Sequence, residues 1–182
     1  MISRTPLIFP AVLLASLFSV TANAQRDHLT PQEVDLVKEA QILDKRVEVF
    51  IKAAERRLIV LHGTQAANSK QLKKDSELWG DLPAGSHADL LNDISGILDE
   101  AITNIDDVSA RDEKNPLIPK ALRRLAEAVN NIMTQVAPFK DQAKSDGEVA
   151  SLESLNEEAQ QILEAVKKLP PPEIEKKAKK KN

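Results

Sequence analysis

The sequence predicts an all-α fold, namely a four-helix bundle with a long first helix and a long first connection. Apolar residues recur at alternating steps of three and four along most of the chain, which is the period of one buried helix face. No segment alternates apolar and polar residues for long enough to predict a strand. Four amphipathic segments bounded by turn residues bury their apolar faces most economically against one another.

The first predicted helix covers residues 31–62 and is the longest. Thr30-Pro31-Gln32-Glu33 supplies an N-cap, a proline suited to the first turn and the glutamate of a capping box. Gly63 ends the helix, which at 1.5 Å per residue would measure roughly 48 Å. The core stripe consists of Leu36, Ala40, Leu43, Val47, Phe50, Ala54, Leu58 and Leu61. A second apolar stripe beside it predicts more than one partner helix.

Three further helices follow. The second is predicted from Ser86 to about Ser109, with Asp89 in the capping-box position. The third starts near Asn115-Pro116 and meets Pro138, where we expect a kink or an early end. The fourth follows a Ser-Asp-Gly break and stops at a run of three prolines. The two later connections are short and favour antiparallel neighbours.

The first connection, Gly63–Gly85, is long enough to cross the bundle and cover the first helix. Its Gln65–Leu78 stretch predicts a short extra helix. Trp79 is the only tryptophan, and no other aromatic residue lies near it in the sequence. We interpret Trp79 as a loop anchor rather than a binding residue. In the second helix, Gly96 either permits the close approach of another helix or is a tolerated weak point.

The first 24 residues predict a cleaved signal peptide. Met1–Arg4 is a short basic region, Leu7–Val20 is an apolar run, and Ala22-Asn23-Ala24 has the pattern of a signal peptidase site. The run is too short to span a bilayer comfortably, and an uncleaved anchor is the rival interpretation. We therefore expect an exported protein, periplasmic or secreted, that is not an integral membrane protein after cleavage.

The remaining chain is expected to form one helical-bundle domain over residues 25–172, followed by a disordered basic tail over residues 173–182. The chain contains no cysteine, so it has no disulfide and a packed core must supply its stability. We expect a monomer or a weak homodimer. An apolar groove left open on the first helix would favour the dimer.

Composition and motifs argue against several functions. The balance of 25 basic and 28 acidic residues gives no reason to expect nucleic-acid binding. No histidine follows a glutamate at the Glu-x-x-His spacing of di-iron bundles, and no catalytic elbow or phosphate-binding glycine loop occurs. We therefore predict no enzyme activity, no cofactor, no metal site and no catalytic residue.

Charge distribution is the most informative feature. Between Asp75 and Ala110 there are nine acidic residues and no lysine or arginine. Either this region meets basic faces of neighbouring helices inside the bundle, or it forms an interaction patch. The candidate patch residues are Asp89, Asp93, Asp99, Glu100, Asp106 and Asp107. The candidate basic contacts of the tail, which would suit an anionic envelope polymer, are Lys176, Lys177, Lys179, Lys180 and Lys181.

Two resemblances bear on function. Leu29-Thr30-Pro31-Gln32 is similar to the Leu-Thr-rich motif of small periplasmic chaperones of the Spy/CpxP group, in which the glutamine normally falls one residue later. The stretches Ala110–Glu127 and Ile42–Leu58 resemble uncharacterised exported helical proteins of bacteria. The second resemblance covers most of the mature chain and implies no activity and no site.

Three hypotheses follow. The first is a non-enzymatic exported bundle that acts by binding an envelope protein or an envelope polymer. The second is a periplasmic bundle that binds a small ligand or a metal among its helices. An enzyme comes last, because no nucleophile, base or metal-ligand set converges in the sequence.

Overall fold

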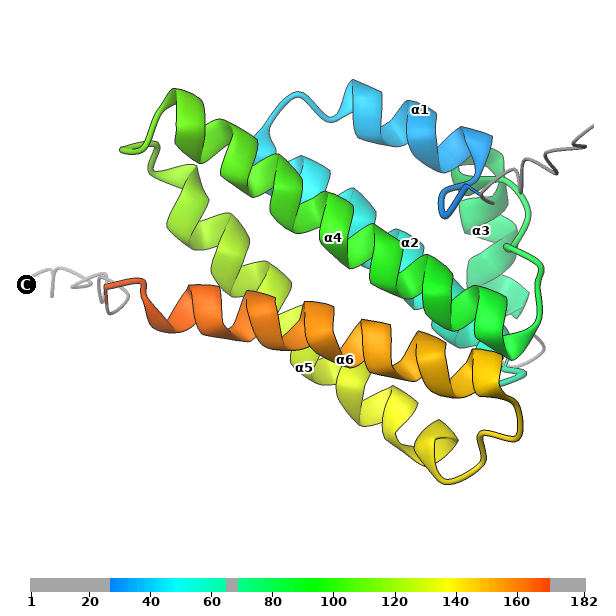
Figure 1. Ribbon diagram of the computed structural model, residues 1–182. Coiled ribbons are helices and arrows are strands. Elements are labelled where there is room, and N and C mark those ends of the chain that lie inside the picture. Colours follow the sequence, from blue (N-terminus) through cyan, green and yellow to red (C-terminus); the bar gives the residue numbers. More distant parts are fainter. Residues whose placement is uncertain (1–26, 65–68, 171–182) are drawn as a thin grey trace, which may run out of the picture.

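The computed structural model describes residues 27–64 and 69–170, and its regular elements there are all α-helices (Figure 1). This confirms the all-α prediction. The helices are α1 (Pro31–Glu39), α2 (Leu43–Leu61), α3 (Ser69–Trp79), α4 (His87–Arg111), α5 (Leu117–Lys140) and α6 (Asp146–Lys167). In the described residues, no helix combines the length and the hydropathy needed to cross a membrane. The predicted signal peptide and basic tail lie outside the described residues.

The prediction of one long first helix is wrong. The chain forms α1 up to Glu39 and begins α2 at Leu43, and α1 then lies back along the bundle (Figure 1). No glycine or proline stands at the break. Its cause is therefore tertiary: the turn allows Glu33 to reach two arginines near the far end of α2, as described below.

Helix starts follow their local capping signals. The predicted capping boxes at Thr30 and Ser86 are both present, and Ser145 caps α6 in the same way. Gly63 adopts a φ of +64° after α2, which is the left-handed conformation that suits glycine at a helix end. Pro138 is inside α5, which ends two residues later at Lys140. These ends were predictable because they depend on contacts within one turn.

Helices α2 and α4 are antiparallel neighbours. Arg46 near the start of α2 donates a hydrogen bond to Asn104 near the end of α4, and Arg57 near the end of α2 pairs with Asp93 near the start of α4. The long connection thus leaves and rejoins the bundle at the same end. The connection therefore does not cross the bundle, but α3 packs against α1 and its Asp75 lies 3.4 Å from Lys52 of α2, so it covers part of residues 31–61 as expected.

Helices α2 and α5 are parallel neighbours, as two ion pairs with the same sequence offset indicate. Lys120 donates to Asp44 over 2.5 Å, and Arg124 lies 2.9 Å from Glu48 one turn further along both helices. The hydrogen bond from Lys120 holds the pKa of Asp44 below its ordinary value. Two basic residues of α5, Lys120 and Arg124, are therefore paired with acidic residues of α2.

Helices α4 and α6 are the second parallel pair, and their contact is the most extensive between any two helices. The hydroxyl groups of Ser95 and Ser154 are 2.9 Å apart. At the start of both helices, a Cβ placed on Gly147 would be 3.9 Å from the Cβ of Ala88. Small side chains thus bring these two helices close together.

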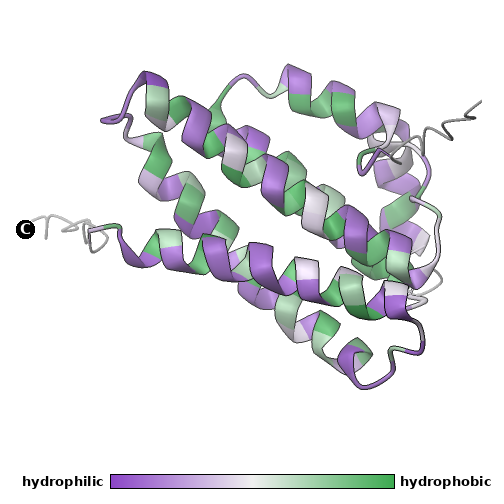
Figure 2. Ribbon diagram, viewed as in Figure 1, coloured by the Kyte–Doolittle hydropathy of each residue, from purple (hydrophilic) through white to green (hydrophobic). Residues whose placement is uncertain are grey.

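The core lies among α2, α4, α5 and α6. Hydrophobic residues gather on the sides of these helices that face one another, and hydrophilic residues cover the outside (Figure 2). The predicted stripes supply the fully buried positions, among them Phe50, Ile94, Leu125 and Leu155. Each helix contributes an apolar stripe, so the core forms without any disulfide.

Candidate functional site

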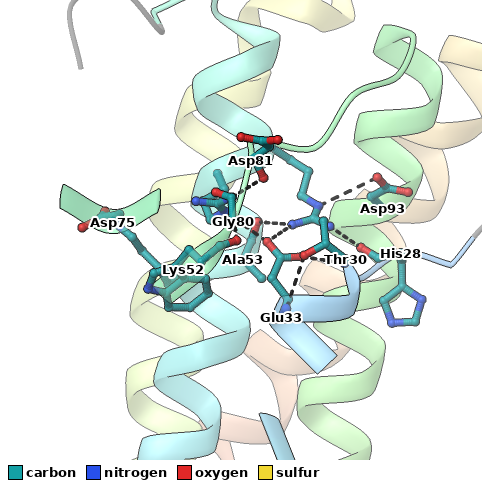
Figure 3. Close-up of polar contacts among 12 residues, drawn as sticks. His28, Thr30, Glu33, Lys52, Ala53, Asp75, Gly80, Asp81 and Asp93 are labelled. Carbon is teal, nitrogen blue, oxygen red and sulfur yellow. Dashed lines mark hydrogen bonds and ion pairs between the residues drawn. The ribbon is translucent and has the colours of Figure 1, made fainter. Parts of the chain in front are cut away.

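A buried ionic cluster ties α1 to α2 (Figure 3). The side chain of Glu33 is fully buried, and its Oε1 accepts hydrogen bonds from Arg56 Nε at 3.2 Å and Arg57 Nη1 at 2.6 Å. Its Oε2 accepts the backbone N–H of Thr30 in the capping box. One glutamate thus caps α1 and neutralises part of the charge of two arginines that are each 1% exposed.

Arg56 also holds the connection between α3 and α4. Its Nη2 donates to the carbonyl oxygens of Trp79, Gly80 and Asp81 at 3.1, 3.1 and 2.6 Å. Gly80 has a φ of +64°, a conformation that glycine adopts without strain and that turns successive carbonyls toward one cation. Burial lowers the pKa of Arg56, and the charge of Glu33 opposes this shift.

Arg57 joins three further parts of the chain. It donates to the carbonyl oxygens of Ala53 at 2.9 Å and His28 at 2.6 Å, and its Nε is 3.8 Å from Asp93 Oδ2. The Nε itself is buried and makes no hydrogen bond. Arg57 therefore fixes the segment before α1 against both α2 and α4.

The cluster is built for structure. Both carboxylate oxygens of Glu33 already accept hydrogen bonds, which leaves it poorly placed to act as a general base. The two arginine side chains are buried, and they bond to Glu33 of α1 and to the backbone of the connection after α3. The sequence gives no signal for this cluster, because the capping box already accounts for Glu33 and the two arginines lie 23 and 24 residues away from it.

Trp79 is half-buried at the end of α3. The Arg56 guanidinium carbon lies 5.7 Å from the centre of its ring, within the range of a cation–π contact. The preceding residue, Leu78, is 59% exposed. Trp79 thus packs against the hydrophobic core and against Arg56, and its anchoring role stays a prediction.

The atoms nearest to Gly96 belong to a side chain of the segment before α1, so they do not show the close helix approach that was one interpretation of this residue. The approaching group is the side chain of His28, whose Cγ would lie 3.0 Å from a Cβ placed on Gly96. The same ring is 2.8 Å from Glu100 through its Nε2. The segment before α1 is therefore seated on α4 by both shape and charge.

The six candidate patch residues of α4 divide into two groups. Asp89 caps the helix, Asp93 faces Arg57 in the buried cluster, and Glu100 pairs with His28. The other members, Asp99, Asp106 and Asp107, are exposed. In the described part of the chain, no ion pair joins these three to a basic side chain.

Helix α6 extends the acidic region. Between Ser145 and Val166 it carries six acidic residues and no lysine or arginine. Partial burial raises the pKa of Glu158, and the charges of Asp99 on α4 and Glu157 on α6 raise it further. The parallel contact of α4 and α6 thus brings carboxylates of both helices together. The contribution of α6 to this acidic region was not predicted, because the order of charges along the chain does not show which helices lie side by side.

The chain contains three histidines, His28, His62 and His87, which are the side chains most often found as metal ligands. The rings of His62 and His87 both contact Phe139, with ring centres 5.1 and 5.5 Å from it. His87 Nδ1 is also 3.8 Å from a carboxylate oxygen of Glu148. Across residues 27–64 and 69–170, no three histidine, cysteine or acidic side chains lie where they could hold a metal ion.

A surface groove of about 730 Å³ runs between α2 and α5. Its lining residues are Ile51, Glu55, Lys120, Arg123, Arg124, Glu127, Ala128 and Asn131. Charges of both signs line the groove, and Lys120 and Arg124 already pair with α2. It therefore has no excess of unpaired charge that would select a charged ligand.

Replacing Glu33 by glutamine tests the ionic cluster. Glu33→Gln preserves size but leaves two buried arginines without their counter-charge, and we expect a loss of about 3–5 kcal/mol in the free energy of unfolding. Glu39→Gln on the exposed side of the same helix should change it by less than about 0.5 kcal/mol. Chemical denaturation measures both, and equal values for the two variants would contradict a structural role for Glu33.

Replacing Trp79 by alanine tests the loop anchor. Because the ring is half-buried, we expect a loss of about 1–2 kcal/mol in unfolding free energy, which is less than the 3–5 kcal/mol typical of a fully buried aromatic ring. The neighbouring Leu78→Ala is the matched control and should have little effect. A Trp79→Ala protein as stable as the control would reopen a binding role for the ring.

Replacing Glu158 by glutamine tests the crowding of carboxylates. The pKa of Glu158 is raised in the folded protein above its ordinary value of 4.5, so its ionisation destabilises the fold. This penalty is absent below the unfolded pKa and complete above the folded one. Glu158→Gln should therefore be more stable than the unmodified protein at pH 7, and the difference should vanish in acid. Glu153→Gln, an exposed residue of α6, is the control.

Comparison with known proteins adds no further constraint. No protein-family model matches the chain, and neither a curated protein nor a solved structure is similar to it at a significant level. The functional conclusion therefore depends on the contacts and charges described above.

Proposed function

We propose that this chain is a non-enzymatic protein of the bacterial envelope that binds a cationic partner protein through the exposed sides of α4 and α6, here called the acidic face. The observation that supports this proposal most is that these adjacent parallel helices have no lysine or arginine over residues 87–110 and 145–166. Beyond the first turns of the two helices, the exposed carboxylates of this face are Asp99, Asp106, Asp107, Glu153, Glu157 and Glu164.

The charge pattern supports an external partner over internal compensation. In the described helices, Asp93 is the candidate patch residue that pairs with an arginine of the bundle, while Lys120 and Arg124 pair with α2. Partial burial raises the pKa of Glu158, and the nearby charges of Asp99 and Glu157 raise it further. A cationic surface docked there would relieve this repulsion.

Export is part of the proposal and is supported by the sequence of residues 1–24. We propose that cleavage after Ala24 leaves a mature chain beginning at Gln25, with one domain over residues 25–172. The lysines of residues 173–182 are proposed to contact an anionic envelope polymer. Mass spectrometry of the protein recovered from a periplasmic fraction tests the cleavage site directly.

We further propose to classify the core as a four-helix bundle formed by α2, α4, α5 and α6, with α1 and α3 as additions at its side. The contacts among these four helices support the classification. A monomer or weak homodimer remains the expected state.

The alternative functions receive less support. A ligand-binding bundle needs an interior site, whereas the buried residues are mostly aliphatic and the buried charges are paired. A Spy/CpxP-like chaperone needs an apolar surface for its clients, whereas the exposed large apolar residues of the described chain are the scattered Ile42, Leu78 and Val149.

Neutralising the acidic face tests the proposed function. A variant with Asp99→Asn, Asp106→Asn, Asp107→Asn and Glu157→Gln should recover at least tenfold less partner in a crosslinking pull-down from the envelope fraction. The matched control changes Glu39→Gln, Glu113→Gln, Glu127→Gln and Asp141→Asn, which are exposed residues outside α4 and α6. Both variants alter net charge equally, so equal recovery would overturn the proposal. Added salt should weaken capture by the unmodified protein.

A further inference from the structure

The break between α1 and α2, residues Ala40–Ile42, has no local cause in the sequence. Neither glycine nor proline occurs from Gln32 to His62, and the apolar steps of three and four continue through the break. A single helix over residues 31–61 is therefore compatible with the local sequence. The break exists because α1 docks on the bundle of its own chain.

Few contacts hold the break itself. The carbonyl of Ala40 accepts a hydrogen bond from Arg46 Nε at 2.9 Å, and Gln41 Nε2 donates to the carbonyl of Lys38 at 2.6 Å. The side chain of Ile42 is 55% exposed. In a continuous helix these carbonyls would accept backbone N–H groups instead, so straightening the break exchanges one set of hydrogen bonds for another.

Straightening the break separates Glu33 from its arginines. At 1.5 Å per residue, Glu33 and Arg56 would be roughly 35 Å apart along one helix, whereas they are 3.2 Å apart in the folded chain. The two buried arginines would then lack a counter-charge, which is strongly unfavourable. A straight helix is therefore stable only if another glutamate reaches Arg56 and Arg57.

We propose that two copies of this chain exchange α1. In the exchanged dimer, α1 and α2 form one helix, and Glu33 of each copy pairs with Arg56 and Arg57 of the other. The chemistry of the surface that α1 leaves determines which segment can occupy it. That surface offers two buried guanidinium groups to one carboxylate, and beside them the space at Gly96 that accepts the ring of His28. The segment His28–Glu33 of a second copy meets both requirements.

The exchange is independent of the proposed acidic face, which lies on α4 and α6. In the exchanged dimer α1 makes the same contacts as in the monomer, and only the break differs. The equilibrium between monomer and exchanged dimer therefore depends mainly on protein concentration. Undocking of α1 uncovers the ionic cluster, so exchange is slow in the folded protein and fast during refolding.

Sedimentation of the refolded chain tests the exchange. Refolding at high concentration should produce a second species of twice the monomer mass in the unmodified protein and in Ile42→Ala, whose break still permits a helix. Ile42→Pro should remain monomeric, because proline at this position blocks a continuous helix. Ile42 is suited to the change, since its φ is −89° and its N–H donates no hydrogen bond in the described chain. A refolded protein that stays monomeric, or a dimer that persists in Ile42→Pro, would overturn the proposal.

A crosslinking measurement gives the same answer without altering the break. The Cβ of His28 would lie 3.3 Å from a Cβ on Gly96, close to the separation in a disulfide, and the chain has no other cysteine. Chains carrying only His28→Cys and chains carrying only Gly96→Cys are refolded together and oxidised. A disulfide-linked pair containing one chain of each kind is the expected result. The proposal fails if this mixed pair is absent while a single chain carrying both changes closes its own disulfide.

Discussion

The pairing of Glu33 with Arg56 and Arg57 is the interaction on which the rest of the structure depends. Buried charges are tolerated only when they are paired and hydrogen-bonded, so two arginines inside the protein require a carboxylate to be brought to them. Bringing it there breaks the first helix and folds α1 back. Arg56 then has donors left for three carbonyls at the end of α3, and this positions the entry into α4.

The arrangement of the helices in two parallel pairs separates the charges. Basic residues of α5 meet acidic residues of α2, whereas α4 and α6 carry carboxylates with no lysine or arginine before their last turns. Close packing at Ser95 and Ser154 allows the two acidic helices to lie side by side, although like charges repel. The apolar contact between these helices thus offsets a repulsion that a cationic partner would remove.

Several parts of the candidate site depend on distances that run across the fold. The ring of Trp79 meets Arg56, a residue 23 positions earlier, and His28 meets Glu100 across 72 positions. Periodicity and spacing report only on neighbours within a helix or a turn, so neither contact had a sequence signal. The glycine at position 96 was the one hint, because a glycine inside a helix often marks a close approach.

The sequence by itself determined the all-helical class, the apolar stripes, and the helix starts at Thr30 and Ser86, because each depends on interactions within about one turn. Only the tertiary structure decided that the first helix breaks, that the long connection returns to the same end, and that α4 lies beside α6. A helix period tells which face is buried but not which helix covers it. For α1, the partner is determined by the two buried arginines of α2, which are stable only when the carboxylate of Glu33 pairs with them.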